Sequence, residues 1–211
     1  MRAMLIAALC LGPCVPAHSD GAREPRLDLQ RARSAFAATF SELCEGASKL
    51  GQFDAVEPEA HEIVFLPAYE GGPERRVALY GFPCNRGAYN VTSVWMIERD
   101  HGGIVPITFA VPEGDLTYAD DTETRVSAYA IVGFATRLEL INASFDPGTL
   151  EMTDHGKWRG LGDAFSAGSW TLQWTGFVLT RYTLDPTMNG EIDPFVAYEA
   201  TDEARKPVLL D

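Results

Sequence analysis

Apolar residues near the start of the chain recur at the spacing of one helix face. Between residues 29 and 50 they stand three or four positions apart, at Leu29, Ala32, Phe36, Phe40, Leu43, Ala47 and Leu50. Asp28 occupies the place of an N-cap residue, and Gly51 follows the last apolar position, where helices commonly end. The pattern predicts an amphipathic helix from residue 29 to residue 50, with its apolar stripe in the core.

After residue 60 the pattern changes to short apolar runs, rich in β-branched and aromatic residues and separated by Gly, Pro and Asp. The predicted strands are Glu62–Leu66, Val77–Phe82, Val91–Ile97, Ile104–Val111, Val126–Phe134, Leu138–Phe145, Ser169–Trp174, Phe177–Thr183 and Phe195–Tyr198. Residues 170–174 alternate apolar with polar, as half-buried antiparallel strands do. The runs lack the helical spacers of a parallel sheet. The expected fold class is mainly β: antiparallel, β-sandwich-like sheets with one N-terminal amphipathic helix.

One acidic segment divides the β region. Residues 112–124 contain five acids and no base, which is typical of a solvated connection. We therefore expect an N-terminal helix plus β half at residues 20–111 and a C-terminal β half at residues 125–211, joined by this segment.

Residues 1–19 have the organisation of a signal peptide. Arg2 supplies a positive start, an eight-residue apolar run follows, and small residues offer cleavage after Ala17 or after Ser19. The run is far shorter than the roughly 20 residues that span a bilayer. A lipoprotein acylated at Cys14 fits less well, because proline precedes that cysteine. We expect cleavage on export and a periplasmic location.

The charge balance restricts the partners. The 211 residues include 17 basic and 30 acidic ones, for a net charge of −13. Nucleic-acid binding needs a basic face that releases counterions, and anionic lipid attracts basic segments. We therefore expect no nucleic-acid partner and no membrane span. An envelope protein or a small ligand remains as the partner.

Two cysteines are expected in the mature chain. Cys10 and Cys14 leave with the signal peptide, whereas Cys44 and Cys84 remain in an oxidising compartment. A disulfide that closes a loop of about 40 residues is favoured over a reactive thiol. Two thiols so far apart, without a His pair, do not make a zinc site. No metal and no cofactor are expected.

The densest polar segment, residues 154–163, allows two interpretations. His155, Lys157, Arg159 and Asp163 form an acid–base group in the first, a small periplasmic hydrolase that uses His155 and Asp163. In the second, glycines allow a sharp bend that an Arg159–Asp163 pair fixes. The second is favoured, because His155 has no orienting partner or nucleophile in the sequence. Catalytic residues stay unassigned.

The segment Asp185–Asp193 has some features of a calcium loop. Acidic and polar residues occupy several ligand positions, but Val196 stands where a bidentate Glu normally completes the site. A plain turn at Asn189-Gly190 is the favoured interpretation. A calcium-stabilised binding module is the alternative.

Several motifs resemble one known family. Cys84-Asn-Arg-Gly-Ala-Tyr-Asn90 is similar to a signature of the secreted bacterial proteins called domain of unknown function 1176, and its core is Gly87, Ala88, Tyr89 and Asn90. Five further segments resemble that family's C-terminal core in the same order: Phe145–Leu150, Lys157–Asp163, Gly168–Trp170, Phe177–Leu179 and Ala197–Ala200. The resemblance covers roughly residues 30–200 and implies a periplasmic protein of unassigned activity, so it carries over no catalytic residue.

The chain lacks two cysteines that the family usually has. Ala164 stands where the family has one of them, and none lies near residues 186–189, where the other is expected. The resemblance therefore implies that a second disulfide is missing as a pair. The function expected from the sequence is an exported, non-catalytic binding or structural role in the bacterial envelope, with the hydrolase and the calcium module as alternatives.

Overall fold

The computed structural model describes residues 25–44, 57–67, 72–100, 102–200 and 208–209. The predicted signal peptide, residues 1–19, lies outside them. The described elements are α1 (Leu29–Phe40), β1 (Glu59–Leu66), β2 (Arg75–Arg86), β3 (Val91–Glu98), β4 (Val105–Pro106), β5 (Phe109–Tyr118), β6 (Val126–Arg137), β7 (Glu139–Ile141), β8 (Ser144–Asp146), β9 (Glu151–Lys157), β10 (Phe165–Gln173), β11 (Gly176–Asp185), β12 (Phe195–Glu199) and β13 (Val208–Leu209). The described strand pairs are all antiparallel. The mainly β fold with antiparallel sheets and one N-terminal helix is confirmed.

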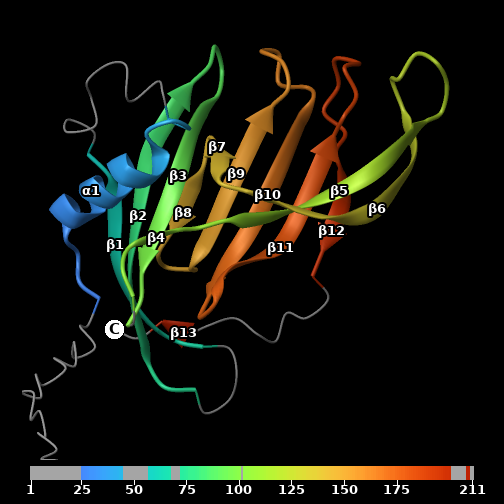
Figure 1. Ribbon diagram of the computed structural model, residues 1–211. Coiled ribbons are helices and arrows are strands. Elements are labelled where there is room, and N and C mark those ends of the chain that lie inside the picture. Colours follow the sequence, from blue (N-terminus) through green and yellow to red (C-terminus); the bar gives the residue numbers. More distant parts are fainter. Residues whose placement is uncertain (1–24, 45–56, 68–71, 101, 201–207, 210–211) are drawn as a thin grey trace, which may run out of the picture.

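The strands form two sheets and a separate hairpin (Figure 1). The first sheet has the order β13-β1-β2-β3-β4, with β7 also paired to β3, and the second has the order β12-β11-β10-β9-β8. The hairpin β5–β6 passes across β10 and β11. β7 pairs with β3, and β13 pairs with β1. The first sheet therefore combines strands that lie far apart in the sequence.

Helix α1 covers the outer face of the first sheet (Figure 1). It begins at Asp28, whose carboxylate accepts the amide of Arg31 at 3.1 Å, as an N-cap does. The apolar cluster beneath it comprises Ala32, Phe36, Phe40 and Cys44 together with Ala78, Tyr80, Phe82, Cys84, Val94 and Met96. The predicted stripe is thus confirmed at its centre, whereas Leu29 and Leu43 are exposed.

The helix ends at Phe40, ten residues before the expected end at residue 50. Two contacts hold the chain in a turn there. The side-chain amide of Asn85 donates to the Leu43 carbonyl at 3.0 Å, and Cys44 is bonded to Cys84 with their Cα atoms 4.6 Å apart. The predicted disulfide is therefore confirmed, and it joins the end of the helix to β2. Residues 45–56 lie outside the described part of the chain.

The main core lies between the inner faces of the two sheets and β5. It contains Ile63, Phe65, Val77, Leu79, Trp95, Ile97, Ile107, Phe109, Val111, Leu140, Phe145, Leu150, Met152, Trp170, Leu172, Phe177, Leu179, Tyr182 and Leu184. The Trp170 indole N–H donates to the Ala110 carbonyl at 2.8 Å, which fixes the hairpin on the second sheet. A buried indole N–H needs such a partner.

The acidic segment 112–124 does not form the expected connection. Its first seven residues belong to β5 and pair with β6, and the rest lies in the turn between those strands. Its five acids are exposed, as predicted, but on the arm and tip of a hairpin. Polar residues alternate with Leu116 and Tyr118 on this arm, and this alternation is the strand signal that the charge count obscured.

Residues 151–157 form a strand, β9, that the sequence analysis did not predict, and its last four residues begin the polar segment 154–163. β9 lies between β8 and β10, with Met152, Asp154 and Gly156 buried. Only one of these three inward residues is apolar, so the hydrophobic period that identifies a strand is missing. Among the described residues, no helix has both the length and the apolarity to cross a membrane.

Candidate functional site

Arg159 and Asp163 form an ion pair that fixes the bend, as the favoured interpretation predicted. We call this pair the Arg159–Asp163 bracket. Arg159 Nε donates to Asp163 Oδ1 at 2.7 Å, and its Nη2 contacts Oδ2 of the same carboxylate. The bracket also holds the loop after β11, because Gly190 N donates to Asp163 Oδ2 at 2.8 Å and Arg159 Nη2 donates to the Met188 carbonyl at 3.0 Å. The guanidinium holds the pKa of Asp163 well below its usual range.

His155 lies apart from this bracket. Its ring packs on Phe165, with the ring centroids 4.6 Å apart. Burial, with a smaller contribution from the charge of Lys157, lowers the pKa of His155, so its neutral form is favoured. Among the described residues no hydrogen bond or ion pair joins His155 to Asp163. The structure therefore does not bring together the pair that the hydrolase interpretation needs.

The calcium-like loop uses its carboxylate internally. Asp185 is buried; its Oδ1 accepts from Thr187 Oγ1 at 2.9 Å, and its Oδ2 accepts from Asp193 N at 2.8 Å. Val196 lies in β12, paired with Thr183. Within the described ranges, no three His, Cys, Asp or Glu side chains gather as a metal site would require.

The signature residues Tyr89 and Asn90 contact the end of β9. Tyr89 Oη donates to the Trp158 carbonyl at 3.1 Å. Asn90 Nδ2 donates to the Lys157 carbonyl at 2.8 Å, and its Oδ1 accepts from the Lys157 amide at 3.3 Å. The turn that presents them is closed by Gly87 N, which donates to the Asn90 carbonyl at 2.8 Å. Two motifs that lie far apart in the sequence therefore meet.

Asn142 joins the same strands from the other side. Its φ of +47° is one that asparagine tolerates better than most residues. Its Nδ2 donates to Asn90 Oδ1 and to the His155 carbonyl, both at 2.9 Å, while its Oδ1 accepts from Val91 N at 2.9 Å. These bonds fix the start of β3 and the end of β7 against β9.

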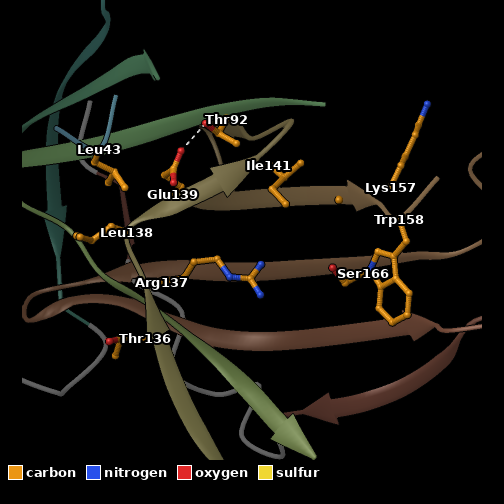
Figure 2. A pocket seen from close by; sticks show the side chains of 11 residues that line it. Leu43, Thr92, Thr136, Arg137, Leu138, Glu139, Ile141, Lys157, Trp158 and Ser166 are labelled. Atoms are coloured by element: carbon orange, nitrogen blue, oxygen red, sulfur yellow. Dashed lines mark hydrogen bonds between the residues drawn. The ribbon is translucent and has the colours of Figure 1, made fainter. Parts of the chain in front are cut away.

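The joined strands border a hollow of about 530 Å³, which we call the Arg137 pocket (Figure 2). Its lining is Leu43, Thr92, Thr136, Arg137, Leu138, Glu139, Ile141, Gly156, Lys157, Trp158 and Ser166. This volume lies within the range of small-molecule sites, roughly 300–1,000 Å³. The residues come from the end of the α1 region and from β3, β6, β7, β9 and β10, so only the folded chain assembles them.

Arg137 points across this pocket toward Ser166 and Trp158 (Figure 2). Its side chain is 34% exposed, and its partner in the described part of the chain is Asp154, with Nη1 3.9 Å from Oδ2. That distance is too long for a hydrogen bond. The guanidinium therefore has its donors available to a ligand.

Asp154 is the buried acidic partner of Arg137. Its side chain is 2% exposed, and its Oδ1 accepts the Gly168 amide at 2.9 Å. Burial raises its pKa to about 6, although the amides of Gly168 and Ile141 and the charge of Arg137 act in the opposite direction. A carboxyl that titrates in this range beside a pocket is one mark of a functional site.

Glu139 forms a second polar group on the opposite wall. Its Oε1 accepts from Thr92 Oγ1 at 2.6 Å, a bond drawn in Figure 2, and from Asn85 Nδ2 at 3.0 Å. Asn85 belongs to the same signature segment as Tyr89 and Asn90. Three signature residues thus hold the walls of one pocket.

Sequence reasoning singled out Lys157 but missed the rest of this pocket. In Figure 2 the Lys157 side chain points away from the other labelled residues. Asp154 was noted only as the first residue of a polar segment. Its place between Met152 and Gly156, two positions from each, was a signal that it lies on the inward face of a strand.

Comparisons with known proteins give the same resemblance. The family described as proteins of unknown function (DUF1176) matches residues 74–193, more than half of the chain. The uncharacterized protein YpfG of Escherichia coli (strain K12) is 30% identical over 111 residues, which are 52% of this chain and 28% of YpfG. The chain thus spans little more than a quarter of that relative. No solved structure matches this chain.

Proposed function

The chain belongs to the DUF1176 family of proteins of unknown function, and from this premise we propose that it is an exported, non-catalytic binding protein of the bacterial envelope whose ligand occupies the Arg137 pocket. The observation that carries the proposal is the Arg137 guanidinium, which points into a hollow of ligand size without making a hydrogen bond to the described residues. Leaving such donors unpaired is costly unless water or a ligand satisfies them.

Binding is also favoured by how rigidly the walls are held. Tyr89 and Asn90 fix the backbone at Lys157 and Trp158, and Asn85 and Thr92 fix the Glu139 carboxylate. A site whose side chains are held by surrounding contacts loses less entropy when a ligand binds.

Export is supported by the N-terminal sequence and by the disulfide. Residues 1–19 have the charged start, apolar run and small residues of a signal peptide, and Cys44–Cys84 is a bond that persists in oxidising compartments. The envelope location rests on these two features.

The two alternatives have less support. For the hydrolase, His155 packs on an aromatic ring and the carboxylate of Asp163 is engaged by Arg159 and Gly190. For the calcium module, the carboxylate of Asp185 accepts bonds from its own loop. In both cases the candidate groups have structural partners.

Two measurements test the proposal. The full-length chain is expressed in a bacterium, the periplasmic fraction is isolated, and intact mass is measured; loss of residues 1–17 or 1–19 is expected. Purified protein is then denatured, and released small molecules are identified by mass spectrometry. Arg137→Gln is compared with Arg181→Gln, a matched control whose arginine pairs with Glu199 at an exposed site.

The wild type and Arg181→Gln should release a small molecule that Arg137→Gln lacks. A chain retained uncleaved in the cytoplasm contradicts export. The binding function is contradicted if the wild type releases no small molecule that is absent from Arg137→Gln. A compound that is converted during incubation with the wild type but not with His155→Ala establishes the hydrolase.

A further inference from the structure

The charges of the Arg137 pocket indicate what kind of ligand it takes. The guanidinium of Arg137 offers a planar fork of N–H donors, which matches the two oxygens of a carboxylate. Ser166 also lines the pocket, and its hydroxyl makes no hydrogen bond to the described residues. In Figure 2 the guanidinium points toward this hydroxyl, so the donors of both residues are directed into the same pocket.

The surrounding charges limit that group to a single negative charge. Glu139 also lines the pocket, and Oδ2 of Asp154 lies 3.9 Å from Nη1 of the guanidinium. Lys157, the other cation of the lining, points away (Figure 2). A dianion costs far more than a monoanion to remove from water, and the pocket offers it one guanidinium beside two acids.

The remaining lining is suited to an apolar body. Leu43 and Leu138 contribute hydrocarbon surface at one end, Ile141 lies between, and the indole of Trp158 stands at the other end (Figure 2). Trp158 is 41% exposed, yet its backbone is held by the Tyr89 hydroxyl and by a bond from its amide to the Ala164 carbonyl at 2.9 Å. An exposed aromatic ring on a fixed backbone offers a flat apolar surface to a ring or short chain.

We propose that the Arg137 pocket binds a small organic monocarboxylate, with its carboxylate on Arg137 and its apolar ring or short hydrocarbon body against Trp158. Ser166 donates a further hydrogen bond to the carboxylate. This inference rests on the proposed binding function and assigns the chemical class of its ligand.

The test uses defined probes on the mature wild-type protein. Isothermal titration calorimetry at pH 7.5 compares the dissociation constants of cyclohexanecarboxylate and cyclohexanecarboxamide. The carboxamide has nearly the same shape and no charge. A third probe, cyclohexyl phosphate, carries close to two charges at this pH. The carboxylate should bind at least about tenfold more tightly than the carboxamide, because a hydrogen bond to a charged group contributes more than a neutral one. The phosphate should bind more weakly than the carboxylate.

Variants then place the binding. Arg137→Gln should abolish the preference for the carboxylate, Arg137→Lys should weaken it because the fork is lost, and Arg181→Gln should leave it unchanged. Trp158→Ala should weaken all probes alike. Since the comparison of probes uses wild-type protein, it decides the inference even if a variant folds poorly.

Equal affinity for carboxylate and carboxamide, tighter binding of the phosphate, or no binding of any probe overturns the inference. The proposed binding function fails separately, when the protein releases no molecule that depends on Arg137. A neutral compound released from wild type, together with equal probe affinities, would refute the carboxylate class and leave the binding function standing.

Discussion

The side chain of Asn90 pairs with the backbone of Lys157 as a neighbouring strand would, donating to its carbonyl at 2.8 Å and accepting from its amide at 3.3 Å. Residue 90 closes the Gly87–Asn90 signature turn, and residue 157 ends β9 beside the Arg137 pocket. The signature therefore has a structural role in this chain: the Asn90 side chain makes the hydrogen bonds to Lys157 that a neighbouring strand would make at the end of β9.

Replacing Asn90 with alanine should lower the free energy of unfolding by about 1–3 kcal/mol, because partly buried groups of Lys157 lose their partners. Urea unfolding followed by far-UV circular dichroism measures the change. Asn189→Ala is the control, since that amide donates to the Thr124 carbonyl at an exposed turn. A loss no larger in Asn90→Ala than in Asn189→Ala would contradict the structural role.

The disulfide should account for a large part of the stability. Cys44 and Cys84 are both buried and close a loop across 40 positions of sequence. Cys44→Ala/Cys84→Ala should reduce the free energy of unfolding by about 3–4 kcal/mol, mostly by freeing the unfolded chain. Denaturant midpoints are measured with and without dithiothreitol. The reductant should lower the wild-type midpoint to that of the variant and leave the variant unchanged; an unaffected wild type argues against the bond.

Gly156 allows β7 and β9 to approach at the floor of the pocket. A Cβ added there would lie 3.0 Å from Ile141 Cδ1. Gly156→Ala should therefore destabilise the fold by about 1–2 kcal/mol through overpacking.

A double-mutant cycle checks the cause. Ile141→Val removes Cδ1, so the cost of Gly156→Ala should largely disappear in that background. Additive effects of the two substitutions would show that the strain arises elsewhere.

Much of the fold could be predicted from local pattern. The N-cap at Asp28, the stripe through Phe36 and Phe40 and the β-branched runs each follow from a short stretch of sequence. The Cys44–Cys84 bond followed from elimination, since no other thiols were expected after export. The early end of α1 could not be read in this way, because it depends on Asn85, a residue of another element.

The pocket could not be predicted for the same physical reason. Arg137, Asp154 and Ser166 lie on three strands, and each alone is an ordinary polar residue of a β protein. β9 was not predicted as a strand because Asp154 and Gly156 occupy inward positions where apolar residues identify a strand. The polar and glycine residues at these inward positions thus removed the signal that would have located the pocket.

The last prediction concerns the carboxyl of Asp154. Arg137 faces it from β6, and the backbone amides of Gly168 and Ile141 face it from β10 and β7, whereas Glu139 lies on the far wall of the pocket. Burial outweighs these favourable contacts and raises its pKa to about 6. In the unfolded chain the pKa of an aspartate is about 3.9.

Between these two pKa values the folded state binds a proton that the unfolded state has released. The contribution of Asp154 to stability therefore falls as the pH rises, by about 2 kcal/mol between pH 4 and pH 7, and is constant above that range. Other carboxylates, such as Asp163 with its lowered pKa, change stability in the opposite direction. Only the difference between wild type and a variant isolates the effect.

Asp154→Asn provides that variant, because asparagine keeps the size and does not titrate. Urea unfolding of both proteins at pH 4, 5, 6 and 7 should give a wild-type stability that declines relative to the variant up to about the raised pKa and levels off above it. Asp146→Asn, at an exposed turn where Oδ1 accepts the Gly148 amide, is the control for the substitution itself. A constant difference between wild type and Asp154→Asn, or one that grows with pH, would mean that Asp154 is ionised at little cost. In that case Arg137 would be a tighter partner of Asp154 than their 3.9 Å separation indicates, and its donors would be less available to a ligand.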